Sequence, residues 1–224
     1  MQHLRTNRLS IFAQFLLVSM GASSALAAEA EWELRRDRDG IQVYTADVEG
    51  SPHDAVRSVT VVSGVPLSAM VALIDDAEAC PEWADRCAES YIVERVSEHE
   101  AYIYTHNDMP FPIRDRDVVA HMQWSQDPES LVVELNSRSV SGKLEEVDGR
   151  LRLTDVQVQW RFEPLDDGSV RVSNQAHVDP GSSLPGWVTN ILLVDTPFET
   201  MRGFVSAVRA PEYLDADPGF IINP

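Results

Sequence analysis

Positive charge is scarce in this sequence. The chain has 18 Lys and Arg residues against 36 Asp and Glu residues, and Lys143 is its only lysine. The formal net charge at pH 7 is −18. A surface of this sign repels phosphate backbones and anionic lipid headgroups. The composition therefore argues against nucleic acid as a partner and against strong electrostatic docking on a membrane.

Long hydrophobic runs are also missing. The apolar stretch at residues 9–20 is too short and too interrupted for a convincing membrane span. Arg5 and Arg8 precede this stretch, and small residues follow it at Ala25 and Ala27, which is typical of a secretory signal peptide. We therefore expect cleavage after Ala27 and a periplasmic or secreted protein.

Removal of residues 1–27 leaves 197 residues, enough for one domain with a sizeable core. The removed segment carries two arginines and no acidic residue, so the net charge falls to −20. We divide the chain into a signal peptide at 1–27, a single domain at 28–210 and a C-terminal tail at 211–224.

Cysteine is nearly absent. Cys80 and Cys87 are the only two, and both lie in the sequence that we expect to be exported. An oxidising compartment favours a local disulfide between them, although two separate buried thiols remain an alternative. Two thiols alone do not make a zinc site.

Enzyme signatures are missing too. The chain contains no G-x-S-x-G, no phosphate-binding loop and no H-E-x-x-H. The histidines at 53, 99, 106, 121 and 177 lack metal-ligand spacing. We therefore predict no catalytic residue, no metal and no cofactor.

One long helix dominates what is present. A Pro/Gly turn at 179–186 leads into an apolar, helical pattern that continues to Val208, with Ser182 or Ser183 as possible caps. Pro197 is expected to kink this helix or to weaken it. One helical stripe carries apolar side chains at Trp187, Ile191, Val194, Phe198, Met201, Val205 and Val208. Such a stripe faces either an ordinary core or an internal cavity.

Strands precede this helix. A short helix is expected at 32–38, strands at 41–46 and 55–62, and a helix at 66–75. Further strands are expected at 90–96, 101–106, 118–124, 131–135, 155–162 and 170–178. Short connections demand an antiparallel sheet, and one long helix covers only one of its faces. We predict an α+β fold, in which a curved antiparallel sheet wraps around the C-terminal helix and leaves room between them.

Three stretches in this order resemble a START domain, the lipid-transfer module related to steroidogenic acute regulatory protein, within the helix-grip superfamily. The first is Glu82-Trp83 with Glu89 and the strand to Val96. The second is 110–119 (PFPIRDRDVV), and the third is 179–190 (DPGSSLPGWVTN). The resemblance covers roughly residues 32–209. It implies a helix-grip fold with an internal hydrophobic cavity.

The resemblance also implies site residues. An acidic residue near the first motif and the arginine of the second commonly form an ion pair in the START cavity. The matching positions are Glu89 and Arg116, with Arg114 as an alternative. Such a pair either orients a ligand headgroup or only supports the fold. The predicted ligand-binding set is Glu89, Arg116, Arg114, Trp187, Ile191, Val194, Phe198 and Met201.

The connection at 107–113 carries apolar side chains beside prolines. In START domains the corresponding loop lies beside the C-terminal helix at the cavity mouth. Met109, Phe111 and Ile113 are therefore predicted to gate entry or to touch a bilayer, with packing of Phe111 under the helix as the alternative.

Three functions compete at this point. The leading one is an exported, monomeric protein that binds or transfers a hydrophobic small molecule, such as a sterol-like, hopanoid-like or acyl lipid, with transient membrane contact. The second is a cyclase- or aromatase-like enzyme with Arg116, Glu89 and His106 as acid/base groups. The third is a sensor whose partner reads ligand occupancy. The apolar stripe and loop favour the first.

Overall fold

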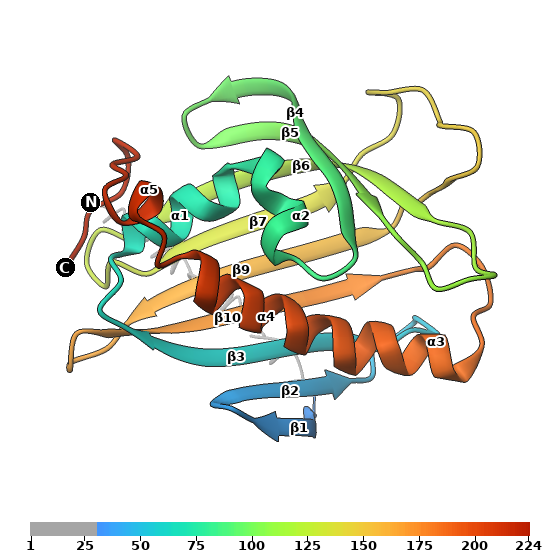
Figure 1. Ribbon diagram of the computed structural model, residues 1–224, viewed down its shortest axis with the longest axis horizontal. Coiled ribbons are helices and arrows are strands. Elements are labelled where there is room, and N and C mark those ends of the chain that lie inside the picture. Colours follow the sequence, from blue (N-terminus) through green and yellow to red (C-terminus); the bar gives the residue numbers. More distant parts are fainter. Residues whose placement is uncertain (1–30) are drawn as a thin grey trace, which may run out of the picture.

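A computed structural model of the protein describes residues 31–224, and Figure 1 shows its arrangement. The expected signal peptide, residues 1–27, lies outside the described residues. The strands are β1 (Glu33–Arg38), β2 (Ile41–Ala46), β3 (Ala55–Ser63), β4 (Cys87–Ser97), β5 (Glu100–Asn107), β6 (Arg116–Gln126), β7 (Val133–Ser139), β8 (Leu151–Arg152), β9 (Val156–Pro164) and β10 (Ser169–Val178). The helical segments are α1 (Leu67–Asp75), η1 (Ala77–Ala79), α2 (Cys80–Trp83), α3 (Gly186–Asn190), η2 (Ile191–Asp195), α4 (Thr196–Ala207) and α5 (Pro211–Leu214).

The strands form one sheet in the order β1-β2-β3-β10-β9-β7-β6-β5-β4. Neighbours along this path are antiparallel, and the short β8 pairs in parallel with β6. The two halves of the sheet meet where β3 pairs with β10, with Ala55 opposite His177. Figure 1 shows α3, η2 and α4 running as one long helix across one face of the sheet. The predicted helix-grip architecture is confirmed.

The first predicted element was wrong. Residues 32–38 were expected to be helical, but most of this segment forms β1, which pairs with β2 at the edge of the sheet. Asp39 and Gly40 between the two strands both have positive φ, as a tight two-residue hairpin requires. The Asp-Gly turn therefore fixes a hairpin, and the ladder with β2 outweighs the local helical pattern.

The long helix contains a wide π-helical turn, η2. Pro197 follows it at the start of α4, so the irregular turn lies where this proline was expected to disturb the helix. The wide turn shifts the side-chain register, so the predicted stripe holds only in part. Trp187 is 51% exposed, whereas its neighbour Val188 is fully buried. The buried helix residues are Val188, Val194, Phe198, Met201, Phe204 and Val208.

The main core lies under the C-terminal half of this helix. Phe204 of α4 contacts the rings of Trp83, Trp160 and Phe162, with centroid distances of 5.9, 5.2 and 6.0 Å. Met70 and Leu73 of α1 are fully buried in the same cluster. This end of the space between sheet and helix is filled by protein side chains.

Two polar attachments hold the helix from either side. The side chain of Thr196 donates to Asp85 Oδ2 at 2.8 Å, and the Asp85 N–H donates to Thr200 Oγ1 at 3.1 Å. On the other side, Arg36 of β1 pairs with Asp195 at 2.6 Å. Asp85 belongs to the segment between Cys80 and Cys87. These two cysteines form a disulfide, so the predicted bridge is confirmed.

The C-terminal tail packs against the domain. Ile221 is 7% exposed and joins the main core, and Asn223 accepts a hydrogen bond from the Ser68 N–H at the start of α1. Tyr213 of α5 donates to Asp76 Oδ2 at 3.0 Å. Within the described residues, no helix is long and apolar enough to span a membrane.

Candidate functional site

The candidate site lies on the inner face of the sheet, toward the N-terminal half of the long helix. Because side chains alternate along a strand, Arg116, Val118 and Ala120 of β6 face the same way as Met122 and Trp124, which belong to the main core. Val118 and Ala120 form a second, smaller apolar cluster with Leu153 and Val156. The inner face of the sheet therefore carries a filled apolar region and a second, separate one.

This second region is less completely covered than the main core. Its four clustered residues keep 5–9% exposure, while most of the main core keeps 0–3%. Ile103 and Val158 are only partly buried and contact both clusters, and Val178 contacts the second. Apolar surface that faces inward and stays accessible is what a hydrophobic ligand requires.

Arg116 lies at the border of this region. It is 4% exposed, and its Nη2 donates to Ser182 Oγ at 3.1 Å in the connection between β10 and α3. Its Nη1 donates to the Arg114 carbonyl oxygen, and its Nε has no hydrogen-bond partner among residues 31–224. Burial and the nearby charge of Arg114 lower the pKa of Arg116. Ser182, expected to cap the helix, instead binds this guanidinium.

The predicted ion pair between Glu89 and Arg116 does not form. Glu89 lies opposite His106 in the β4–β5 ladder and pairs with Arg150 at 3.3 Å, with its side chain 50% exposed. Arg150 also binds the hydroxyl of Tyr104, which lies on the outer face of the sheet. Glu89 is therefore on the outer face, and Arg116 is on the inner one. The motif resemblance could not show which face each side chain takes.

A buried ion pair exists one residue away, on the outer face. Asp117 is fully buried and accepts from Arg152 Nε and Nη2 at 2.9 and 3.0 Å, and from the Tyr104 hydroxyl at 3.0 Å. Burial alone would raise the pKa of Asp117, but the hydrogen bonds from Arg152 and Tyr104 outweigh it and lower this pKa. The pair fastens β8 to β6 and supports the fold. Sequence reasoning missed Arg152, because β8 is too short to leave a periodic signal.

The predicted helix residues differ in their burial. Phe198 and Met201 are 1% and 0% exposed and belong to the filled main core. Val194 is 7% exposed, and Ile191 is partly buried within the wide turn. Trp187 is largely exposed at the start of α3. Ile191 and Val194 lie in the wide turn η2, outside both apolar clusters.

The loop between β5 and β6 presents apolar side chains outward. Phe111 is 93% exposed, so the alternative in which it packs under the helix is wrong. Met109 and Ile113 are partly exposed. Figure 1 shows this loop at the same end of the molecule as the connection between β10 and α3, and Arg116 joins the two through Ser182.

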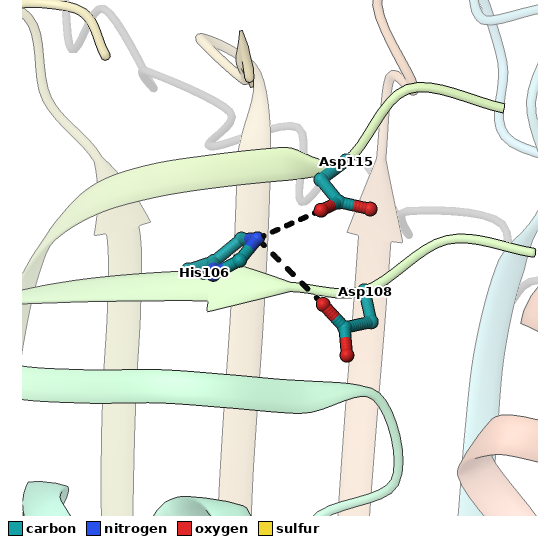
Figure 2. A group of neighbouring side chains, drawn as sticks. All are labelled: His106, Asp108 and Asp115. Atoms are coloured by element: carbon teal, nitrogen blue, oxygen red, sulfur yellow. Dashed lines mark hydrogen bonds and ion pairs between the residues drawn. The ribbon is translucent and has the colours of Figure 1, made fainter. Parts of the chain in front are cut away.

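A polar cluster closes the base of this loop, as Figure 2 shows. Nε2 of His106 lies 3.1 Å from a carboxylate oxygen of Asp115 and 3.8 Å from one of Asp108. Asp115 also accepts from the Met109 N–H at 2.9 Å. Burial alone would raise the pKa of Asp115, but the bonds from Met109 and His106 lower it. One possible metal-ligand atom from each of His106, Asp108 and Asp115 lies within 4.8 Å of the other two, a grouping that could hold a metal ion. The spacing of these residues in the sequence did not reveal this group.

Two clefts flank α4. One, of about 680 Å³, lies between α2 and α4 and is lined by Trp83, Arg86, Asp108 and Arg202 among others. The other, of about 540 Å³, lies between α4 and strands β2 and β3. At the floor of the first, α4 passes so close to α2 that a Cβ on Gly203 would lie 2.0 Å from the Trp83 carbonyl oxygen.

Comparison with known proteins agrees with this architecture. The START domain family model matches residues 19–212. An uncharacterised protein of Pseudomonas aeruginosa is 31% identical over 188 residues, which cover 84% of this chain and 91% of that protein. A STAR-related lipid transfer protein fragment from Xanthomonas axonopodis has 31% identity and a TM-score of 0.72, covering 80% of this chain and 99% of that one.

Human STARD10 has the same fold, with 22% identity and a TM-score of 0.71 over 84% of this chain and 77% of that one. The family match extends over most of the chain, including the sheet, the long helix and the loop between β5 and β6. This protein therefore belongs to the START domain family, a membership that supports a role in binding a hydrophobic ligand.

Proposed function

We propose that this protein is an exported carrier that holds one hydrophobic molecule between the sheet and its C-terminal helix and moves it through the periplasm. Export is supported by residues 1–27, in which two arginines, an apolar stretch and small residues follow one another as in a secretory signal peptide. It is also supported by the Cys80–Cys87 disulfide, since such bridges persist in oxidising compartments.

One observation carries the ligand-binding part of this proposal. Ile103, Val158 and Val178 face the interior yet stay only partly buried, beside the well-filled main core. A carrier gains free energy when its ligand covers such surface, at about 25 cal/mol per Å² of apolar area. A sterol-like, hopanoid-like or acyl chain has the apolar area that this requires.

Exchange with a membrane is assigned to the loop between β5 and β6. Phe111 and Trp187 are exposed large apolar residues on that loop and at the start of α3. Their insertion at a bilayer surface needs no basic patch, which suits a protein of such acidic composition. Contact there would place the membrane beside the Arg116–Ser182 bond that joins the two segments.

The enzyme alternative loses support because its three candidate residues do not converge. Arg116 lies on the inner face of the sheet, whereas Glu89 and His106 belong to the outer face. Acid/base chemistry needs its groups within hydrogen-bond reach of one substrate. A carrier requires no such convergence.

The first experiment is native mass spectrometry of protein purified after expression of the full-length chain, followed by organic extraction. We expect a stoichiometric lipid and an N-terminus at residue 28. Transfer is then measured with fluorescent lipid moving between vesicles, where Phe111→Asp should slow transfer while Val61→Asp, on the exposed side of β3, should not. Protein that is empty, and stays empty when offered a lipid panel, would overturn the proposal.

A further inference from the structure

His106 lies between two carboxylates at the base of the loop between β5 and β6. Asp108 is the first residue after β5, and Asp115 is the last residue before β6. Figure 2 shows both carboxylates directed toward Nε2 of His106, which lies 3.1 Å from Asp115 and 3.8 Å from Asp108. Among residues 31–224, no other group of three or more His, Cys, Asp and Glu side chains converges in this way. The donor set is therefore particular to the base of this loop.

The protein leaves the negative charge of this group unbalanced. Neither Asp108 nor Asp115 pairs with a lysine or an arginine of the part of the chain that the structure describes. Arg150 acts on Asp115 only from a distance, because its own guanidinium binds Glu89 and the hydroxyl of Tyr104. Two carboxylates exceed the charge of a single imidazole even when that imidazole is protonated. A bound cation would supply the missing positive charge.

The distances suit a tetrahedral metal ion. Metal–ligand bonds of about 2.0–2.2 Å at tetrahedral angles place two ligand atoms about 3.3–3.5 Å apart. The two distances from His106 Nε2, 3.1 and 3.8 Å, lie on either side of that range. Oδ2 of Asp115 faces the histidine, while its Oδ1 accepts from the Met109 N–H. That bond fixes the orientation of the carboxylate, as supporting hydrogen bonds do around metal ligands.

The group combines a fixed ligand with an accessible one. His106 is 9% exposed, and its position on β5 holds the imidazole in place. The side chain of Asp108 is 63% exposed, so an ion can enter from solvent on that side. Three protein ligands leave a further position for water. A small rotation of the exposed Asp108 side chain is enough to complete the coordination.

We propose that His106, Asp108 and Asp115 bind a divalent transition-metal ion of the zinc type, and that this ion fastens together the two ends of the loop that carries Phe111. A nitrogen beside two carboxylate oxygens suits Zn²⁺, whereas Mg²⁺ and Ca²⁺ prefer oxygen ligands alone. Both cysteines are in the disulfide, so no thiolate competes for the ion. The site lies on the outer face of the sheet with His106, so it does not depend on the proposed carrier function.

The first test compares cations on the wild type. Protein expressed from the full-length chain is purified without a polyhistidine tag, treated with EDTA, dialysed, and titrated calorimetrically with ZnCl₂, MgCl₂ or CaCl₂. We expect a single tight Zn²⁺ ion per chain, with Mg²⁺ and Ca²⁺ bound at least about tenfold more weakly. If Zn²⁺ does not bind, or if all three ions bind equally, the group is an ordinary acidic surface and the proposal is wrong.

A variant connects the ion to these residues. Asp108→Asn should weaken Zn²⁺ binding at least about tenfold, since even the loss of groups that only support a metal ligand costs that much. Because the Asp108 side chain is largely exposed, the fold should remain intact, with an unchanged melting temperature in EDTA. Glu100→Gln is the matched control, because Glu100 pairs with His121 at 2.7 Å outside any group of three ligands. Equal Zn²⁺ affinity of Asp108→Asn and wild type would place the ion elsewhere and refute the site.

Hydrogen exchange tests the effect on the loop. Zn²⁺ should slow amide exchange in residues 108–115, because the ion holds both ends of this segment. Exchange in the turn between β9 and β10, residues 165–168, should not change. The slowing should be lost in Asp108→Asn and kept in Glu100→Gln. Bound Zn²⁺ with unchanged exchange in 108–115 would refute the fastening of the loop.

Discussion

Gly203 is where the structure makes its sharpest stability prediction. A Cβ built on Gly203 would lie 2.0 Å from the Trp83 carbonyl oxygen, and real Cβ atoms essentially never come closer than 3.0 Å. Gly203→Ala therefore forces α2 and α4 apart by about 1 Å. The contact is with backbone, and Trp83 is held by its ring contacts with Trp160 and Phe204, so the clash has no flexible side chain to relieve it.

The magnitude follows from two opposing effects. Overpacking of a well-ordered contact costs about 1–3 kcal/mol, and a backbone clash belongs at the upper end of that range. Alanine in place of glycine in a helix returns about 1 kcal/mol. The expected net loss for Gly203→Ala is about 2 kcal/mol, or about 4–8 °C in melting temperature for a domain of this size.

Urea unfolding followed by tryptophan fluorescence, together with thermal unfolding, measures this loss. Gly186→Ala is the matched control, since Gly186 begins α3 of the same long helix and a Cβ there would meet nothing within 4 Å. The control should be as stable as the wild type or slightly more stable. If Gly203→Ala matched the control, the close passage of α4 over α2 would be refuted.

Three further predictions concern the rest of the fold. Asp117→Asn should destabilise the protein by about 3–5 kcal/mol in urea unfolding, because it leaves Arg152 buried and unpaired; a loss below 1 kcal/mol would contradict the buried pair. Stability measured against pH should fall at both ends. The pKa of Asp117 is lowered by folding, so its contribution to stability is present above about pH 4 and is lost as the pH falls through the folded pKa. Burial and Asp76 raise the pKa of Tyr213 to about 12. Tyr213 therefore contributes stability that is present below about pH 10 and is lost as the pH rises to about 12. Asp117→Asn should remove part of the acid dependence and Tyr213→Phe part of the alkaline one, and unchanged profiles would refute these assignments. Replacement of Cys80 and Cys87 by serine should cost about 2–3 kcal/mol, as expected for a short closed loop, and an unchanged melting temperature would show that the bridge does not hold α2 in place.

Most of the fold could be predicted because it follows from local periodicity. The alternation around Trp160 predicted β9, and the apolar spacing before Val208 predicted the long helix. The wide turn at η2 could not be predicted, because one added residue per turn leaves the composition unchanged while it rotates the remainder of the helix. Trp187 was therefore assigned to the buried face that Val188 occupies.

The site was predicted less well, because it depends on which face of a strand each side chain takes. Arg116 was identified correctly as a buried polar residue, but its partner was not, since Glu89 lies beyond the irregular pairing at the start of β4. The cluster of His106, Asp108 and Asp115 depends on the pairing of two strand ends across a loop. Sequence spacing alone does not reveal such a meeting.

The pairing of β3 with β10 also determines the order in which the chain can fold. The first three strands are complete by Ser63, yet the strand that β3 must pair with ends at Val178, more than a hundred residues later. During synthesis the N-terminal strands therefore have an open edge until nearly the whole chain has emerged. Long-range pairing of this kind slows folding. A chain that cannot close its sheet early keeps the edge of β3 unpaired for longer, and an unpaired edge is where another chain can add a strand.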